Sequence, residues 1–398
     1  MPGWDSFSEF ISEAQKTPVN ERQALVDVLL NERTTFPWVE PKRATFIYNG
    51  ANVKAVALNL DTIKADPPFM PMEKLEGTDL FYVTYPFESD DLLDYLLAVD
   101  DPMTPLSSEK PEDLAKRVQT YWKMDPLNPA GMKTATLDVS VLRMPEARPF
   151  PDWSRMQGVN RGSTVEHKID SQVLGVTGRK VWVHTPPNYR DSGLIYPLLI
   201  LQDGQWAIGP LQVTHIIDTL IKHGRMAPVV TAMVQSGSQQ ERLRDYVRRD
   251  TYYDFVMDEL LPFLQSQYRL DSTNLGIGGA SAGAIAAADA ALRNPAVFNT
   301  LIMLSPPLGK GPAQEKLSMY QERFSEARLL PRRIFHSVGR YEGIVRFLRP
   351  NVELAEVLMA RTDIEYQFVE TGSGHGLVTF RSMLPEALAW AFPGWASL

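Results

Sequence analysis

The spacing of apolar residues changes along the chain, and each change predicts a different kind of structure. Residues 20–31 (NERQALVDVLLN) place apolar side chains on one helical face and predict a short amphipathic helix. From residue 43 the chain shows short runs rich in β-branched and aromatic residues, separated by turns that contain Gly, Pro and Asp. These runs predict the strands of a small β-sandwich, and they read ATFIYNG, NVKAVALNL, TDLFYVTYPF and LLDYLLAV.

Beyond residue 162, strand-like runs alternate with helical segments. The runs read STVEHKIDSQV, RKVWVHTPP, PLLILQD, VVTAMVQS, NLGIGGAS, TLIMLSP, RIFHSVG and IEYQFVE. Such alternation predicts an α/β domain with a mostly parallel sheet, which binds ligands at the carboxyl ends of its strands. The predicted order is a helical segment over 1–40, a β-sandwich over 41–142, a Pro-rich linker over 143–161 and the α/β domain over 162–398.

Composition narrows the class of protein. The 398 residues are 44% hydrophobic, which is sufficient for two cores, and the net charge of −8 leaves no basic excess for binding nucleic acid. The absence of cysteine excludes disulfides, cysteine metal sites and thiol nucleophiles together. No apolar stretch approaches 18 residues, and the first twenty residues lack the pattern of a signal peptide. We therefore expect no membrane span, and the absence of thiols is compatible with a cytoplasmic location, while the oligomeric state stays open.

Residues 279–283 contain a motif that indicates a catalytic residue. They read Gly-Ala-Ser-Ala-Gly and match G-x-S-x-G, the nucleophile elbow of α/β-hydrolases. An exposed serine at a tight strand-to-helix turn needs neighbours without bulk, and Gly279 and Gly283 meet that need. A strand-like run precedes the motif, and the Ala-rich residues 284–292 after it predict a helix. Ser281 is therefore the predicted nucleophile of a serine hydrolase.

The serine needs a base and an acid to orient that base. In this fold the order along the chain is serine, acid, histidine, and only His336 and His375 follow the serine. His375 lies in the Gly-rich loop TGSGHG and is the predicted base, whereas His336 lies within an alternating strand and is predicted to be structural. Glu342 comes just beyond that strand and is the predicted acid, with Asp363 and Glu370 as open alternatives.

Two backbone N–H groups must stabilise the oxyanion that forms when the serine attacks. Ala282 directly follows the nucleophile and is expected to supply one of them. The loop that ends the run YPLLILQDGQW is expected to supply the other, from Gly204 or Gln205. The histidine would take the serine proton and return it to the leaving group. Because the histidines are widely spread, without zinc-ligand spacing, we expect neither a metal nor a cofactor.

The chain resembles a known family, the enterochelin (ferric enterobactin) esterases, over nearly its whole length. TFIYNG, GTDLFYVTY, DPLNP and LRMPEARPFPDW carry the resemblance in the first half, and ILQDGQW, ELLPFL, the G-x-S-x-G segment, GRYE and GHG carry it in the second. The resemblance implies an Ig-like sandwich before an α/β-hydrolase domain. It also implies a cytoplasmic enzyme that opens the trilactone of a ferric tricatecholate siderophore, with iron entering only as part of the substrate. Carried over by position, the triad falls on Ser281, Glu342 and His375.

Two further residues are expected to contact substrate. Arg242, which with Asp245 and Tyr246 belongs to the resemblance, lies in ERLRDYVRRD (residues 241–250). A guanidinium there, on the rim of the cleft, would attract an anionic complex and rest on catechol planes. The alternative is a helix whose arginines pair with its own carboxylates. Trp206, beside the oxyanion loop, would form an apolar wall of the site or pack in the core.

Two departures from the family pattern keep other functions open. Ala282 and Ala284 stand where the family usually has a larger residue and a glycine. The loop 305–308 (SPPL) lacks the aromatic residues common there, which reduces the surface available for stacking catechols. The alternatives are an esterase for other acyl, carbohydrate or aryl esters, and a non-catalytic binding protein on the same fold. An intact triad argues against the second alternative.

Overall fold

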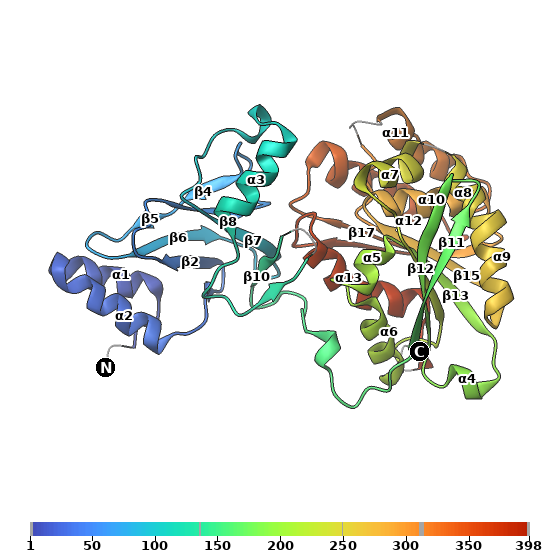
Figure 1. The fold of residues 1–398 in the computed structure, drawn as a ribbon, viewed down its shortest axis with the longest axis horizontal. Helices are drawn as coiled ribbons and strands as arrows, with labels where there is room; N and C mark the ends of the chain where they lie inside the picture. The colour runs from blue at the N-terminus through green and yellow to red at the C-terminus, as the bar shows by residue number, and fades with distance from the viewer. Residues whose placement is uncertain (1–2, 135–136, 249, 310–313, 396–398) are drawn as a thin grey trace. The chain divides into compact units, whose positions relative to one another are not determined.

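The computed structural model describes residues 3–134, 137–248, 250–309 and 314–395 (Figure 1). The chain divides into two compact units. The first consists of Met1–Pro149 with Gly372–Val378, and the second of Phe150–Thr371 with Thr379–Leu398. The boundary after Pro149 falls inside the linker predicted over 143–161.

The first unit contains two antiparallel sheets, as the alternating runs predict. Among the described residues, the first sheet has the order β1-β2-β6-β5, and the second has the order β4-β3-β7-β10-β9 with β8 paired to β7. The strands are β1 (Trp38–Glu40), β2 (Arg43–Asn49), β3 (Val56–Leu60), β4 (Phe69–Pro71), β5 (Glu73–Lys74), β6 (Leu80–Pro86), β7 (Leu92–Val99), β8 (Trp122–Lys123), β9 (Gly131–Met132) and β10 (Val139–Arg143). An Ig-like arrangement of these strands stays a prediction.

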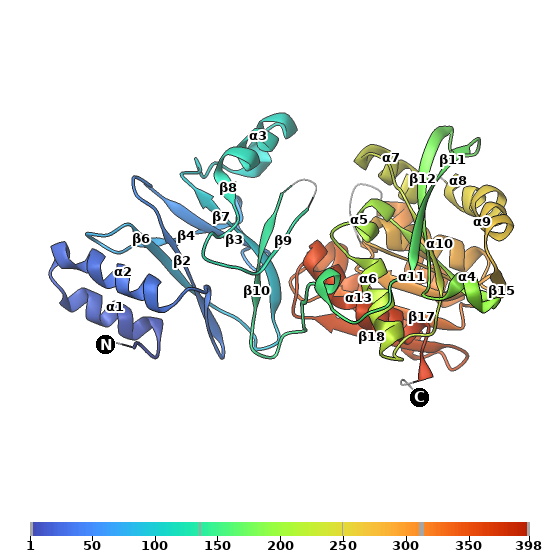
Figure 2. The same cartoon turned by 60° about the horizontal axis from the view of Figure 1, so that its bottom comes forward.

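Helices cover the outer face of the first sheet (Figure 2). They are α1 (Phe7–Lys16) and α2 (Arg22–Glu32), and a third helix, α3 (Pro111–Tyr121), precedes β8. Successive side chains of a strand point to opposite faces, so Phe46 of β2 meets Tyr95 of the other sheet at a ring distance of 4.8 Å. Ile47, the next residue, packs on the opposite face with Phe10 and Leu29 of the helices. The helix predicted over 20–31 is α2, α1 lies within the helical segment predicted over 1–40 without bounds of its own, and both belong to the core of this unit.

The second unit is built on one mixed sheet. Among the described residues its order is β11-β12-β14-β13-β15-β16-β17-β18, with antiparallel pairing from β11 to β14 and parallel pairing from β14 to β18. The strands are β11 (Ser163–Ser171), β12 (Val176–Thr185), β13 (Tyr196–Gln202), β14 (Val230–Val234), β15 (Leu270–Ala280), β16 (Phe298–Leu304), β17 (Arg333–Gly339) and β18 (Glu365–Thr371). The predicted mostly parallel sheet is confirmed, and β15 to β18 end at one edge.

Helices lie on both faces of this sheet (Figures 1 and 2). One face carries α7 (Gln239–Leu243), the π-helical turns η4 (Arg244–Arg248) and η5 (Phe255–Leu260), α8 (Thr251–Asp254), α9 (Leu261–Gln267), α10 (Ala282–Arg293), α11 (Gln314–Glu326) and α12 (Arg349–Met359). The other carries α5 (Gly204–Ile208), α6 (Val213–Lys222) and α13 (Leu377–Ala391). The short helix α4 (Tyr189–Ser192) precedes β13, and the π-helical turn η6 (Ile344–Leu348) precedes α12.

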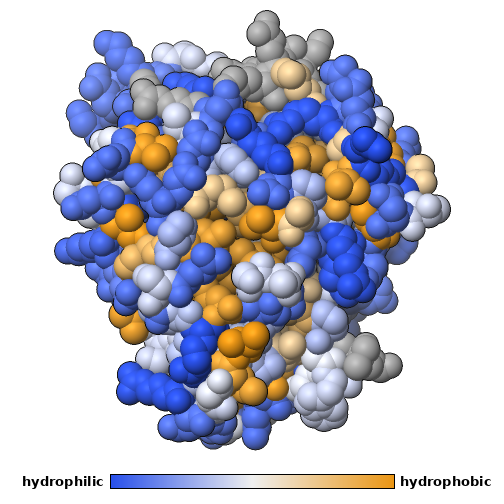
Figure 3. All heavy atoms as spheres, turned by 90° about the vertical axis from the view of Figure 1, so that its right-hand side faces the viewer, coloured by the Kyte–Doolittle hydropathy of each residue, from blue (hydrophilic) through white to orange (hydrophobic). Residues whose placement is uncertain are grey.

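Polar and charged side chains interrupt the apolar ones on the face shown in Figure 3. Among the described residues, no helix is both long and apolar enough to cross a bilayer.

Candidate active site

Ser281 lies at a strained turn between β15 and α10. Its backbone has φ 54° and ψ −127°, which a residue with a side chain rarely adopts. The strain persists because the backbone is held on both sides of the turn: the Ser281 N–H donates to the Leu304 carbonyl at 2.8 Å, and the Ala284 N–H donates to the Ser281 carbonyl at 3.0 Å. A strained residue at a strand-to-helix turn is typical of a functional site. The local conformation of the predicted elbow is therefore confirmed.

The two motif glycines are required by close backbone approach. A Cβ on Gly279 would lie 2.5 Å from the carbonyl of Gly283, so strand and helix could not pack as they do. A Cβ on Gly283 would lie 2.9 Å from the Asp203 carboxylate. The elbow is thus packed directly against the loop that follows β13.

That neighbouring loop contains the predicted second oxyanion donor. Asp203 has φ 59° and is followed at once by Gly204 and Gln205, the first residues of α5. A Cβ on Gly204 would lie 2.5 Å from the Met233 carbonyl, which explains the glycine. The first N–H groups of a helix have no acceptor inside it, and this applies to Gly204 and Gln205 as well as to Ala282 in α10. Their role as oxyanion donors stays a prediction.

Arg242 differs from the exposed rim residue that the sequence predicts. Its side chain is 5% exposed and forms a bidentate ion pair with Asp203, with Nε to Oδ1 at 2.7 Å and Nη2 to Oδ2 at 2.8 Å. Nη2 also donates to the Ala280 carbonyl at 3.3 Å, and the guanidinium lies 4.8 Å from the centre of the Trp206 ring. Burial disfavours the charge, but the hydrogen bonds and charge of Asp203 outweigh it and raise the pKa of Arg242.

The arrangement shows what Arg242 does in the folded chain. It joins the loop after β13, through Asp203, to the last residue of β15. A second contact, from the Asp203 N–H to the Tyr246 hydroxyl at 3.3 Å, holds the same loop. Asp245, which the sequence offers as a partner, instead pairs with Arg179 and Arg244. Arg242 is therefore a structural support of the site, and its contact with substrate stays a prediction.

Glu342 lies where an orienting acid is expected. It comes just after β17 and is 3% exposed. Its Oε1 accepts hydrogen bonds from the Ser305 hydroxyl at 2.5 Å and from the Gly339 N–H at 2.7 Å. Ser305 follows β16 directly and itself has φ 49°. Two hydrogen bonds fix one oxygen of this buried carboxylate, and the sequence analysis did not identify Ser305 as a partner.

The alternative acids have different surroundings. Asp363 lies before the amino end of β18, at the far end of that strand from the elbow, and both its oxygens accept from Arg361 at 2.7 Å. Glu370 is 42% exposed and pairs with Arg340 at 3.5 Å. Exposed pairs of this kind are common on protein surfaces. The geometry favours Glu342 over both.

His336 has the surroundings of a structural residue. It is fully buried in β17, with Nε2 2.6 Å from Asn351 Oδ1 and Nδ1 2.9 Å from the Tyr366 hydroxyl. Burial lowers its pKa to about 4, so the ring is neutral at physiological pH. The amide of Asn351 also donates to the Pro306 carbonyl at 2.8 Å. The histidine therefore helps to fix the loop after β16.

His375 lies four residues beyond the end of β18, in a segment that groups with the first unit. Its backbone N–H donates to Asp61 Oδ2 at 2.9 Å. Gly374 lies directly against the carboxylate of Asp61, and Gly376 lies against that of Asp94. A Cβ on either glycine would come within 2.5 Å of that carboxylate. Burial, and then the charge of Asp61, raise the pKa of Asp94 to about 6. The domain predicted over 162–398 is therefore not one compact stretch, since Gly372–Val378 packs with the first unit.

A pocket opens at Ser281. Arg242, Arg248 and Arg346 contribute to its lining, together with Gln239, Leu243, Val247, Ala282, Pro307 and Leu317. Arg248 and Arg346 are exposed, unlike Arg242. Arg346 was not predicted, because nothing in its local sequence separates it from an ordinary surface arginine. Among the residues that the structure describes, no group of three or more His, Asp or Glu side chains could hold a metal ion.

Two models of known protein families match the chain. The family model described as "Putative esterase" matches residues 171–391, more than half of the chain. The chain belongs to this family. A second model, described as enterochelin esterase, N-terminal, matches residues 33–153 of this esterase. The protein is an ester hydrolase, as the elbow serine predicts.

Solved structures show the same architecture. This esterase is similar to the ferric enterobactin esterase of Salmonella typhimurium, with a TM-score of 0.75, 20% identity and coverage of 92% of this chain and 98% of that one. It is also similar to the enterobactin esterase of Shigella flexneri, solved in the presence of enterobactin, with a TM-score of 0.71 and 21% identity. That match covers 87% of this chain and 92% of the other. A ferulic acid esterase matches with a TM-score of 0.51 and 18% identity, over 58% of this chain and 98% of its own. No curated protein matches the chain. At these identities the likeness establishes the fold.

Proposed function

We propose that this esterase cleaves ester bonds with the triad Ser281, Glu342 and His375. The observation that carries the proposal is the strained elbow at Ser281, next to two helix N-termini whose N–H groups have no intrahelical partner. The buried carboxylate of Glu342, held after β17, supports the choice of acid. The position of His375 after β18 supports the choice of base, because the final histidine of this triad order follows a late strand.

In this mechanism His375 removes the proton of Ser281 as its Oγ attacks the ester carbonyl. Glu342 holds the imidazole and stabilises its charged form. The N–H of Ala282 and that of Gly204 or Gln205 donate to the oxyanion. His375 then protonates the leaving alkoxide, and water repeats the sequence to release the acid and restore the serine.

We further propose that the substrate is the trilactone of a ferric catecholate siderophore, hydrolysed in the cytoplasm. An N-terminal module of the enterochelin esterase type supports this substrate class. The exposed Arg248 and Arg346 in the Ser281 pocket support an anionic substrate, because guanidinium groups bind anions and rest on aromatic planes. The similarity to a ferulic acid esterase over 58% of this chain favours an aryl ester as the alternative substrate.

Substitution of the triad tests the chemistry. Ser281→Ala and His375→Ala should each lower kcat on the order of 10⁶-fold, and Glu342→Ala about 10⁴-fold, because triad members act as a unit. Asp363→Ala is the matched control and should retain normal activity, since that carboxylate lies on the surface. A folded His375→Ala enzyme with near-normal turnover would refute the assignment. A silent Glu342→Ala together with an inactive Glu370→Ala would show that the acid is wrong.

Substrate class is tested separately. Arg346→Gln should raise KM for ferric trilactone at least tenfold and leave a neutral aryl ester unchanged, because a charge-assisted contact contributes about 1.5 to 3 kcal/mol. Added salt should act in the same way on the anionic substrate alone. Arg332→Gln, at a guanidinium that is 78% exposed, is the matched control. Good aryl-ester turnover with no cleavage of any catecholate trilactone would favour the general esterase.

A further inference from the structure

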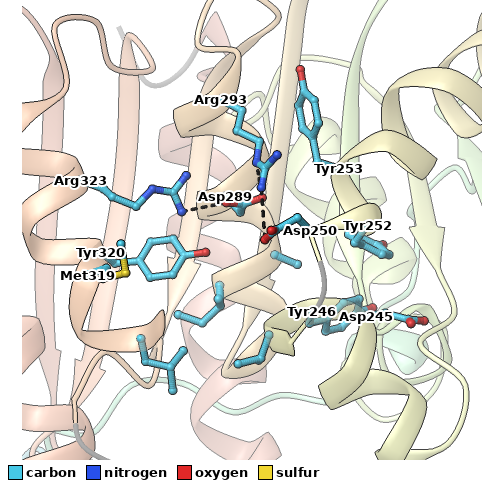
Figure 4. A pocket seen from close by; sticks show the side chains of 14 residues that line it. Asp245, Tyr246, Asp250, Tyr252, Tyr253, Asp289, Arg293, Met319, Tyr320 and Arg323 are labelled. Atoms are coloured by element: carbon cyan, nitrogen blue, oxygen red, sulfur yellow. Dashed lines mark hydrogen bonds and ion pairs between the residues drawn. The ribbon is translucent and has the colours of Figure 1, made fainter. Parts of the chain in front are cut away.

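Carboxylates in this esterase have two different kinds of partner. In the pocket beside α10, Arg293 and Arg323 point toward Asp289 from opposite sides, and each pairs with it at 2.8 Å (Figure 4). The charges there are used within the pocket. In the first unit, by contrast, the carboxylates of three aspartates lie against one loop. That loop is Gly372–Val378, and it carries His375, the proposed base.

The loop has a glycine at every second position, and each of these glycines lies against a different carboxylate. A Cβ on any of the three would come within 2.7 Å of the carboxylate that it faces. Only a residue without a side chain permits so close an approach. The contacts with the first unit therefore account for the spacing of the glycines. The pairs are Gly372 with Asp91, Gly374 with Asp61, and Gly376 with Asp94.

Two paired strands bring these aspartates together. β3 and β7 are antiparallel with Leu60 opposite Tyr95, so the next positions in this register are Asp61 and Asp94. Asp91 directly precedes β7. Because β7 pairs with β3 on one side and with β10 on the other, hydrogen bonds hold it from both sides. The aspartates therefore have fixed positions in or beside the sheet.

Hydrogen bonds attach the loop to this part of the first unit. The Leu92 N–H donates to the Gly372 carbonyl at 2.8 Å, and the Ser373 hydroxyl donates to the Leu92 carbonyl at 2.7 Å. These two bonds hold the beginning of the loop against β7. The bond from the His375 N–H to Asp61 Oδ2, at 2.9 Å, acts on the backbone of the histidine itself. Since the rotamers open to a side chain depend on its own φ and ψ, this bond also limits the directions of the imidazole.

We propose that Asp61 is a positioning residue for His375. Its carboxylate holds the backbone N–H of the histidine and so sets the direction in which the imidazole leaves the loop. The inference rests on the proposed role of His375 as the base. Asp61 acts through the histidine and makes no bond to substrate, so its loss lowers kcat and leaves KM unchanged. Misplacing a catalytic group by about 1 Å costs about 10²-fold in rate.

Steady-state kinetics of full-length variants tests this role. Asp61→Ala should lower kcat at least tenfold with KM unchanged. Asp61→Asn keeps an oxygen that can accept the His375 N–H and should restore most of the activity. Asp100→Ala is the matched control and should leave kcat unchanged. Asp100 is also an exposed aspartate of the first unit, but it accepts the N–H groups of Lys54 and Ala55, at 2.8 and 3.0 Å.

A second variant disturbs the same contact without removing the charge. Gly374→Ala places a methyl group against the Asp61 carboxylate and should lower kcat as well. Urea midpoints of all variants show whether each is folded. A kcat of Asp61→Ala no lower than that of Asp100→Ala, or an unchanged kcat in Gly374→Ala, would overturn the inference. So would Asp61→Asn as inactive as Asp61→Ala.

The triad variants separate this inference from the proposed function. An inactive His375→Ala together with a fully active Asp61→Ala would refute the positioning role and leave the triad intact. Near-normal turnover of folded His375→Ala would refute the base, and the positioning role with it.

Discussion

Removing the guanidinium of Arg242 should destabilise the second unit and weaken catalysis on every substrate. Arg242 and Asp203 are 5% and 4% exposed, so Arg242→Ala leaves a carboxylate buried without its partner. Loss of one member of a buried pair costs about 3 to 5 kcal/mol, because the remaining charge is neither solvated nor paired. The variant also loses the contact to the Ala280 carbonyl and the face of Trp206.

The catalytic loss follows from the position of Asp203. Its loop continues directly into Gly204 and Gln205, whose N–H groups are the proposed oxyanion donors. Displacement of one such donor lowers kcat by about 10²-fold to 10³-fold. Because the oxyanion forms with any ester, a neutral aryl ester and a charged substrate should lose activity equally.

Urea denaturation and steady-state kinetics check both parts. With a urea m value of up to about 3 kcal/mol/M, a loss of about 4 kcal/mol lowers the unfolding midpoint of the second unit by more than about 1 M. The control variant Arg332→Ala should change the free energy of unfolding by less than about 0.5 kcal/mol. Arg242→Met combined with Asp203→Asn should be less destabilised than Arg242→Ala, because no charge is left buried.

One result would refute this reasoning. If Arg242→Ala unfolds at the wild-type urea concentration and raises KM for an anionic ester alone, the guanidinium binds substrate and does not support the loop.

Three further outcomes are expected. The pKa of Asp94, raised by burial and by Asp61 to about 6, lies above that of an unfolded chain, so the free energy of unfolding should fall as pH rises from about 4 to about 6. This decrease in the free energy of unfolding is at most about 3 kcal/mol, and urea titrations of Asp94→Asn across the same pH range should not show it. The same pH dependence in wild type and Asp94→Asn would contradict the prediction. Ser305→Ala removes a hydrogen bond to the Glu342 carboxylate and should lower kcat about tenfold or more, whereas an unchanged kcat would show that this bond does not orient the acid. Hydrolysis of an iron-free ester should survive exhaustive chelation, and activity lost to a chelator and restored by zinc would contradict the metal-free mechanism.

The features that could be predicted from the sequence are those encoded by patterns of neighbouring residues. The elbow at Ser281 was predictable because its signals are close in the sequence: two glycines, a strand before and a helix after. The parallel sheet followed from the alternation of strands and helices, and the position of Glu342 followed from the end of β17. The bounds of helix α1, inside the helical segment predicted over 1–40, were not read from the local pattern.

The sequence alone was therefore enough to recognise the family and to predict candidates for the nucleophile, the base and the acid. Only the tertiary structure decided which charged groups are paired. Arg242 meets a carboxylate 39 residues away, and the His375 N–H meets Asp61 across 314 residues. Such pairs depend on how strand ends and loops come together in the fold, and no spacing along the chain encodes them. Burial then determines whether a guanidinium supports the site, as Arg242 does, or remains exposed in the pocket, as Arg346 does.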